Sequence, residues 1–312
     1  MSSVPHISHD SWPELPYEDW KATKQTLHRY TQIAGKVRMA LTPPRNHWWH
    51  VALYVTERGL TTGPMPYRGR DVSIDFDFIE HQAAVRSSDG AAAGFDLRDR
   101  PACADFFTDV FRALSKVDVE VDIHPQPFDL GDSPALDEDR VHASYDADAV
   151  ERYWRILGST QRVLDAFRGS FLGKASPVHL FWHSFDLAYA RYSGREAPVS
   201  EDADRVSAEA YSHEVIAFGF WPGDERTTAY PAFYSYTAPE PDGLAQQPLG
   251  VSEAEWQGTG NGSLAVLPYD AVRGSSDPGA TLHEFFEAAY RAGAKTAGWD
   301  TDALTRTAGP PR

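Results

Sequence analysis

Strict alternation of apolar and polar residues over 71–81, DVSIDFDFIEH, is the feature that most limits how this chain can fold. Val72, Ile74, Phe76 and Phe78 would lie on one face of a strand, with serine and aspartates on the other. A strand of this kind buries one face and leaves the other near solvent, which is typical of antiparallel sheets. The pattern therefore predicts an antiparallel sheet that covers a core with one face.

Helices and further strands are expected along the rest of the chain. Helical periodicity predicts helices over 17–35, about 101–115, 146–173 and 278–296, with Gly35 and Gly173 as stops of the first and third. Strands are expected at 36–42, 46–55, 84–86, 119–125, 178–194, 213–221, 231–237 and 263–270. Residues 125–140 are rich in proline and aspartate and lack periodicity, which indicates a connector.

The parts on either side of that connector resemble each other. Each opens with a tryptophan-bearing helix ending in Gly-Lys, continues through a histidine-containing strand, and closes on a helix with a Phe-Phe pair. We therefore expect an α+β fold of two similar halves, each a mainly antiparallel sheet flanked by helices, as an internal duplication would give. The expected boundaries are 1–124 for the N-terminal half, 125–140 for the connector, and 141–312 for the C-terminal half packed against the first.

Charge and composition narrow the expected partners. The 45 acidic and 29 basic residues give a net charge of −16, and no basic cluster offsets it, so we expect neither nucleic acid nor a membrane surface as partner. No segment reaches the roughly 20 apolar residues that span a bilayer, and the N-terminus lacks a signal-peptide pattern. Cys103 is the only cysteine, which excludes an internal disulfide and fits a cytoplasmic protein. We expect it to be a packing residue.

Several stretches together point to a family. They are 12–62, from WPELPYEDW to ERGLTT; VHASYD at 141–146; VERYWRIL at 150–157; GKASPVHLFWHSFDLAYARYSGR at 173–195; and AYSHEVIAFGFWPG at 210–223. These resemble the bacterial domain-of-unknown-function family numbered 5996, over nearly the whole chain. The resemblance implies no particular activity.

Two histidines and two tryptophans stand together in RNHWWHVALYV, residues 45–55. On a strand, His47 would share a face with Trp49, and His50 with Trp48. The Cα atoms of the two histidines would lie about 10 Å apart, too far to share one zinc ion. We expect His50 to line a pocket, within one hydrogen-bonded neighbour of His179 or His213. Alternatively, one histidine is a hydrogen-bonded core residue and the other lies at the surface.

Two other predicted strands also carry histidine beside acidic and aromatic residues. In VHLFWHSFDLAYARYSG, a strand would place His179 and His183 on one face, with Trp182 and Asp186 on the other, whereas a helix would align both histidines as ligands.

His213 and Trp221 would share one face of HEVIAFGFW with small residues that leave room for a ligand. Glu214 would point the other way. It is either at an exposed strand end or a buried acid of the kind that serves as a general base.

The concentration of aromatic residues and histidine on these strands favours a small-molecule pocket. If the protein is an enzyme, histidine would act as general acid or base. The expected catalytic residues are His50, His179, His213 and Glu214, and the expected ligand-binding residues are His47, Trp48, Trp49, Trp182, Asp186 and Trp221. Two alternatives stay open: a metal-dependent enzyme with ligands among His47, His50, His179, His183 and His213, and a non-catalytic small-molecule-binding or interaction module. The sequence names no cofactor, substrate or oligomeric state.

Overall fold

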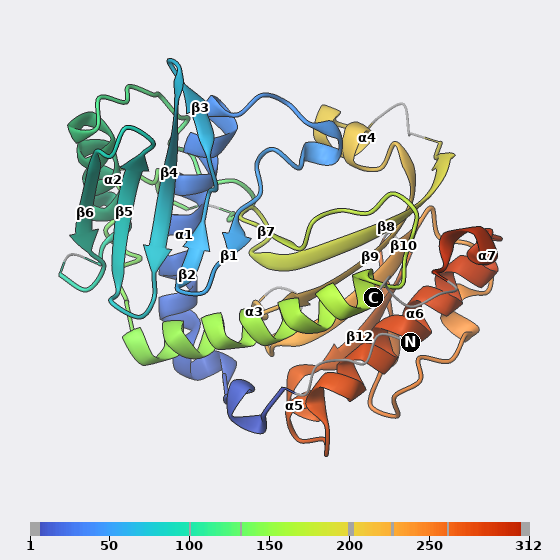
Figure 1. Ribbon diagram of the computed structural model, residues 1–312. Helices are drawn as coiled ribbons and strands as arrows, with labels where there is room; N and C mark the ends of the chain where they lie inside the picture. Colours follow the sequence, from blue (N-terminus) through green and yellow to red (C-terminus); the bar gives the residue numbers. More distant parts are fainter. Residues whose placement is uncertain are drawn as a thin grey trace, which may run out of the picture.

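The computed structural model describes residues 7–99, 101–131, 133–198, 203–225, 228–260 and 262–306. It contains two antiparallel sheets of six strands each, with helices packed on them (Figure 1). This confirms the predicted α+β fold with two sheet-containing halves. Within the described ranges, no helix is both long and apolar enough to cross a membrane.

The first sheet has the order β1-β2-β4-β5-β6, and β3 also pairs with β4. Its strands are β1 (Tyr54–Val55), β2 (Gly59–Thr61), β3 (Met65–Tyr67), β4 (Arg70–Asp77), β5 (Gln82–Ser87) and β6 (Ala92–Asp96). In β4, Val72, Ile74 and Phe76 are buried and Ser73 and Asp75 are partly exposed, as the alternation predicts. The helix α2 (Cys103–Lys116) packs on β5 and β6, and its first residue, Cys103, is a buried packing residue.

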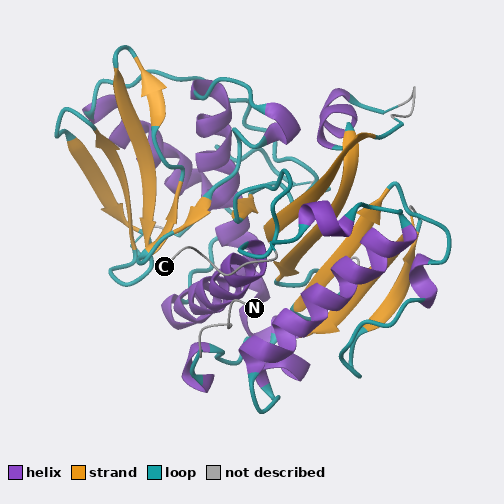
Figure 2. Ribbon diagram, turned by 45° about the vertical axis from the view of Figure 1, so that its right-hand side comes forward, coloured by secondary structure: helices purple, strands orange, loops and turns teal. Residues whose placement is uncertain are grey.

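The second sheet has the order β11-β12-β10-β9-β8-β7. Its strands are β7 (His179–Phe181), β8 (Asp186–Glu196), β9 (His213–Trp221), β10 (Ala232–Ala238), β11 (Glu255–Thr259) and β12 (Gly262–Pro268). One face packs through Phe218 and Phe233 against α3 (Ala147–Arg168) and α6 (Pro278–Thr296), and Figure 2 shows α6 lying along this sheet. The opposite face carries Asp186, Tyr192, Tyr234 and Tyr236, and we call it the tyrosine face.

Short helices complete the structure. They are η1 (His9–Ser11), η2 (Asn46–Trp48), α4 (Arg205–Ala210), η3 (Leu244–Gln246), α5 (Tyr269–Arg273) and α7 (Thr301–Leu304). Of these, α4 packs against η2.

The halves meet at the adjacent edges of the sheets and along α1 (Tyr17–Leu41). Leu53, just before β1, and Leu180 in β7 exchange both backbone hydrogen bonds, each 2.8 Å long. The helix α1 contacts α2 and β3 of the first half and α3 of the second, and Figure 1 shows it behind β2 and β4. Both halves follow the order helix, antiparallel sheet, helix. The internal duplication and the boundaries at 125 and 140 stay predictions.

The helix α1 is longer than predicted, and the strand expected at 36–42 is wrong. Gly35 lies inside the helix, and Trp182 packs directly on it. A Cβ at Gly35 would lie 2.0 Å from Cδ1 of the Trp182 ring. The glycine therefore permits close approach of an aromatic ring and does not end the helix.

The strand predicted at 46–55 is also wrong, because His47 and Trp48 have left-handed φ angles of 55° and 59° and only Tyr54–Val55 pairs as a strand. The segment 178–194 is a hairpin, with a turn at 182–185 between β7 and β8. Phe185 ends that turn at a φ of 60°. These left-handed residues are ones that a propensity-based interpretation cannot anticipate, since non-glycine residues rarely adopt positive φ.

Two smaller expectations fail for identifiable reasons. Residues 119–125 are described but form no regular strand, and the backbone N–H of Glu120 donates to the Tyr67 hydroxyl at 3.0 Å. The helix predicted to run to Gly173 ends at Arg168. The Arg191 guanidinium donates a hydrogen bond to the carbonyl of Phe167 at 2.5 Å. In a longer helix, this carbonyl would accept a backbone N–H from the next turn instead.

Replacing Gly35 with alanine should destabilise the protein by about 1–3 kcal/mol, because the added methyl group overlaps the buried Trp182 ring. Gly158→Ala in α3 is the matched control, since no atom lies within 4 Å of the added carbon, and it should stabilise by up to about 1 kcal/mol through helix propensity. Urea unfolding of both variants measures the difference. Equal effects at the two positions would show that Trp182 does not constrain α1.

Candidate functional site

The structure separates the predicted site residues into different surroundings. His47, Trp49 and His213 come together near the end of the tyrosine face, and Asp186 lies at the start of β8 on the same face. Four other predicted residues lie in or against the core: Trp48, His50, His179 and Trp182. Trp221 is the last residue of β9. Glu214 lines a cavity on the other side of the second sheet.

The first of these groups is the histidine–lysine cluster, made of His47, Trp49, Lys174, Tyr192 and His213. His47 comes from η2, and its Nδ1 lies 3.0 Å from the carbonyl oxygen of Ala210, at the end of α4. A carbonyl oxygen can only accept, so Nδ1 carries the proton and Nε2 is an acceptor. Nζ of Lys174, in the loop after α3, donates to that Nε2 at 2.6 Å.

Aromatic rings surround this polar pair. Nζ of Lys174 lies 5.7 Å from the ring centroid of Trp49 and 5.2 Å from that of Tyr192. The His47 ring lies 4.5 Å from Tyr192 and 5.7 Å from His213, measured between centroids. His47 and Tyr192 are buried, whereas Lys174 is exposed. The cluster therefore places a buried imidazole beside a solvent-accessible amine.

Burial governs the proton equilibria of the pair. It lowers the pKa of His47, and the nearby Lys174 and His213 lower it further. Burial also lowers the pKa of Lys174. The resting pair is consequently a neutral imidazole beside an ammonium group that loses its proton more easily than an ordinary lysine.

The turn at 182–185 forms the second group. Its Phe185 ring stacks between His28 of α1, at 4.8 Å, and Tyr153 of α3, at 5.2 Å. Nε2 of His28 donates to the carbonyl of Trp182 at 2.9 Å. The left-handed backbone of Phe185 is thus held from both sides by packed rings.

Directly after the turn, Asp186 receives two hydrogen bonds, from the Ser184 hydroxyl and from the Tyr234 hydroxyl. The Tyr234 ring reaches it by crossing Gly219, where an added Cβ would lie 2.5 Å from the phenol oxygen. Asp186 is buried. It therefore serves as a fixed acceptor within the tyrosine face.

The remaining predicted histidines are core residues. Nδ1 of His50 accepts from the backbone N–H of Arg45 at 3.2 Å, and its ring lies 5.2 Å from Trp48. His179 is 1% exposed, and its Nδ1 has no hydrogen-bond partner among the described residues. Burial lowers the pKa of His179 to about 3. The ring of His213 lies beside His47 and not beside His50, and the role predicted for His50 stays a prediction.

Trp182 and Trp221 differ in role. The indole N–H of Trp182 donates to the carbonyl of Val51 at 3.0 Å, and its ring fills the space above Gly35. Trp221 is half-buried at the end of β9, opposite Ala232 of β10. Trp182 is thus a structural anchor between the halves.

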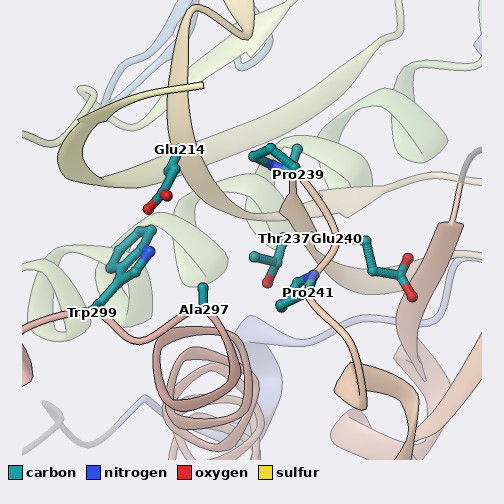
Figure 3. A pocket seen from close by; sticks show the side chains of 8 residues that line it. Glu214, Thr237, Pro239, Glu240, Pro241, Ala297 and Trp299 are labelled. Carbon is teal, nitrogen blue, oxygen red and sulfur yellow. The ribbon is translucent and has the colours of Figure 1, made fainter. Parts of the chain in front are cut away.

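Glu214 lies at the start of β9 and pairs with Arg195, whose Nε and Nη2 lie 2.9 and 2.7 Å from Oε2. It also lines a cavity of about 230 Å³ together with Trp299, Ala297 and residues 237–241 (Figure 3). Glu214 is half-buried. The strand-end position that the sequence allowed is the observed one, although the carboxylate also faces a cavity.

Across the ranges that the structure describes, no group of three or more His, Cys, Asp or Glu side chains is arranged to hold a metal ion. His47 and His50 of the H-x-x-H pattern each have a partner of their own, Lys174 and the Arg45 backbone.

Sequence reasoning missed Lys174, Tyr192 and Tyr234. Lys174 follows Gly173 at what was expected to be a helix end, and its partner His47 is 127 residues away in the chain. The residues next to a single lysine in a loop do not indicate a contact with a histidine so far away in the sequence. The tyrosines lie within correctly predicted strands, but only the sheet register brings them onto one face.

The comparisons with known proteins give a family and nothing more specific. The model of a family of unknown function, DUF5996, matches residues 12–306. The chain belongs to this family. No curated protein and no solved structure matches the chain. For this member of DUF5996, function has to be argued from the site itself.

Acid should destabilise the fold through its buried neutral histidines. Burial lowers the pKa of His179 to about 3 and that of His28 well below its usual value, so only the unfolded chain takes up these protons as the pH falls below about 6.5. Each histidine then costs about 1.4 kcal/mol per pH unit until its folded-state pKa is reached.

Urea unfolding of the wild type and of His179→Leu at pH 7 and pH 5 measures this loss. The variant should lose about 2 kcal/mol less than the wild type over that interval. The same loss in both proteins would mean that His179 is protonated in the fold.

Proposed function

We propose that the protein binds a small carbonyl compound, an aldehyde or ketone, at the histidine–lysine cluster. Lys174 would be the reacting amine, and His47 the group that accepts and returns protons. One observation carries the proposal: Nζ of Lys174 lies 2.6 Å from Nε2 of a histidine whose other nitrogen is committed to the carbonyl of Ala210. This is the geometry of a nucleophile beside its general base.

The chemistry follows from that contact. The Lys174 ammonium passes a proton to Nε2 of His47, and the free amine attacks the carbonyl carbon. The C=O π bond breaks as the C–N bond forms, and the oxygen takes up the proton that the attacking nitrogen then releases. The resulting carbinolamine loses water, with the protonated imidazole of His47 supplying the proton for the departing hydroxyl group. The net change is carbonyl compound plus amine to imine plus water, and it needs no oxidant or metal.

The surrounding rings indicate what the rest of the ligand looks like. Trp49 and Tyr192 lie within 6 Å of the reacting nitrogen, so a planar apolar group next to the carbonyl could stack on them. Because Lys174 is exposed, the ligand can enter from solvent. These features support the small-molecule site and the histidine acid–base role expected from the sequence.

The two alternatives from the sequence fare differently. A metal-dependent enzyme has no supporting cluster of ligands in the described part of the chain. A non-catalytic binding module would use the same aromatic rings without reaction at Lys174, so covalent trapping distinguishes it from the proposal.

Benzaldehyde with sodium cyanoborohydride should label Lys174 preferentially, because the reductant converts an imine into a stable secondary amine. Lys116 and Lys295 are exposed lysines outside the cluster and act as internal controls. Because burial lowers the pKa of Lys174, a larger share of its amine is unprotonated at neutral pH, and we expect it to be labelled faster than either control lysine. Peptide mass mapping after short exposure measures the three rates.

His47→Gln should slow labelling of Lys174, since glutamine can accept a hydrogen bond but cannot take up a proton. Trp49→Ala should remove the advantage of benzaldehyde over acetaldehyde. Equal labelling of all three lysines in the wild type would refute the proposal. A benzaldehyde-induced rise in melting temperature without labelling would favour the non-catalytic module.

A further inference from the structure

The cavity beside Glu214 is separate from the histidine–lysine cluster. Successive residues of a strand point to opposite faces, so His213 contacts the cluster while Glu214 lies on the face of Ile216 and Thr237, which are paired in the ladder. The cavity has a volume of about 230 Å³. It lies where β9 begins, β10 ends and the C-terminal end of α6 comes close (Figure 3).

The cavity contains an indole N–H that has no acceptor. Trp299 is 6% exposed, and its Nε1 is buried without a hydrogen-bond partner among the described residues. In Figure 3 the nitrogen is on the side of the ring that faces Thr237 across the cavity. Buried N–H groups are nearly always paired with protein or with a bound molecule, so this one calls for an oxygen acceptor inside the cavity.

Oxygen atoms of Glu214 and of the C-terminal end of α6 border the same cavity. The Glu214 carboxylate points toward Trp299 (Figure 3), and Arg195 bonds to its Oε2, whereas its Oε1 has no hydrogen-bond partner among the described residues. The carbonyls of Ala297 and Gly298, at the negative end of the α6 dipole, already accept from Arg195 at 2.6 and 3.2 Å. These acceptors therefore already hold one cationic group, the Arg195 guanidinium, at the edge of this cavity.

The other walls are mostly apolar. Pro239, Pro241, Ala238 and Ala297 line them. Glu240 also borders the cavity, but its carboxylate bonds to the backbone and hydroxyl of Ser263 and points away in Figure 3. A ligand must consequently match one carboxylate, one indole N–H and a small apolar enclosure.

We propose that this cavity binds a small primary ammonium ion that carries an oxygen acceptor a few bonds from its nitrogen, as in an amino alcohol. The ammonium group donates to Oε1 of Glu214 beside the aromatic ring of Trp299, where cation–π attraction adds to the ion pair. The oxygen accepts from the Trp299 indole N–H. The carbon chain lies against the prolines.

The probe is ethanolamine, and the readout is the indole N–H resonance of Trp299 in the full-length ¹⁵N-labelled protein, assigned by its loss in Trp299→Phe. We expect a saturable shift with ethanolamine, a weaker effect with choline, which cannot donate to Glu214, and none with 1-propanol. An equal shift with 1-propanol would show that only an apolar additive enters, and no saturable shift would also overturn the proposal.

Glu214→Gln should weaken ethanolamine binding at least tenfold, whereas Glu240→Gln, with its carboxylate directed away, should leave it unchanged. The other indole resonances report whether each variant is folded. If Glu214→Gln does not fold, Ala297→Leu fills the cavity without removing a charge and should abolish the shift. Binding that survives the filled cavity would place ethanolamine elsewhere and refute the site.

Discussion

The packing of the 182–185 turn against α1 is the constraint on which the arrangement of the two halves depends. Phe185 holds a left-handed backbone, which costs about 1 kcal/mol or more, and its ring is fixed between His28 and Tyr153. Three residues earlier in the chain, Trp182 fills the space above Gly35, and its indole N–H donates to the carbonyl of Val51. The turn of the second half is thereby bound to the central helix and to the segment leading into the first sheet.

A series of contacts along the tyrosine face connects the turn at 182–185 to the histidine–lysine cluster. Asp186 follows the turn and receives the Tyr234 hydroxyl, and Tyr234 stacks on Tyr236 at 6.2 Å. The Tyr236 hydroxyl lies 3.0 Å from that of Tyr211, which caps α4, the helix whose Ala210 carbonyl orients His47. The imidazole is therefore positioned through a continuous series of packed rings and hydrogen bonds, and its proton is held on Nδ1 before any ligand arrives.

How far the sequence could predict this structure depends on how local each signal is. The alternation in β4 and the periodicity of α2 and α6 report burial directly, and β9, which is buried on both faces, is a short apolar run; these elements were predicted correctly. The expected strand at 46–55 failed because the left-handed turn at His47 depends on distant partners, Lys174 and Ala210. His47, Trp49 and His213 were predicted as site residues and do meet, but the amine of Lys174 that contacts His47 left no local pattern.

Alternation along β9 also explains why neighbouring residues belong to different sites. His213 meets His47 on the tyrosine face, and Glu214 faces the cavity at the end of α6. The strand is paired on both edges, with β8 and β10, so its backbone cannot rotate to exchange these faces without breaking two ladders. Because such a shift would also turn Ile216 and Phe218 out of the core, we expect that a ligand at one of the two proposed sites would leave the geometry of the other unchanged.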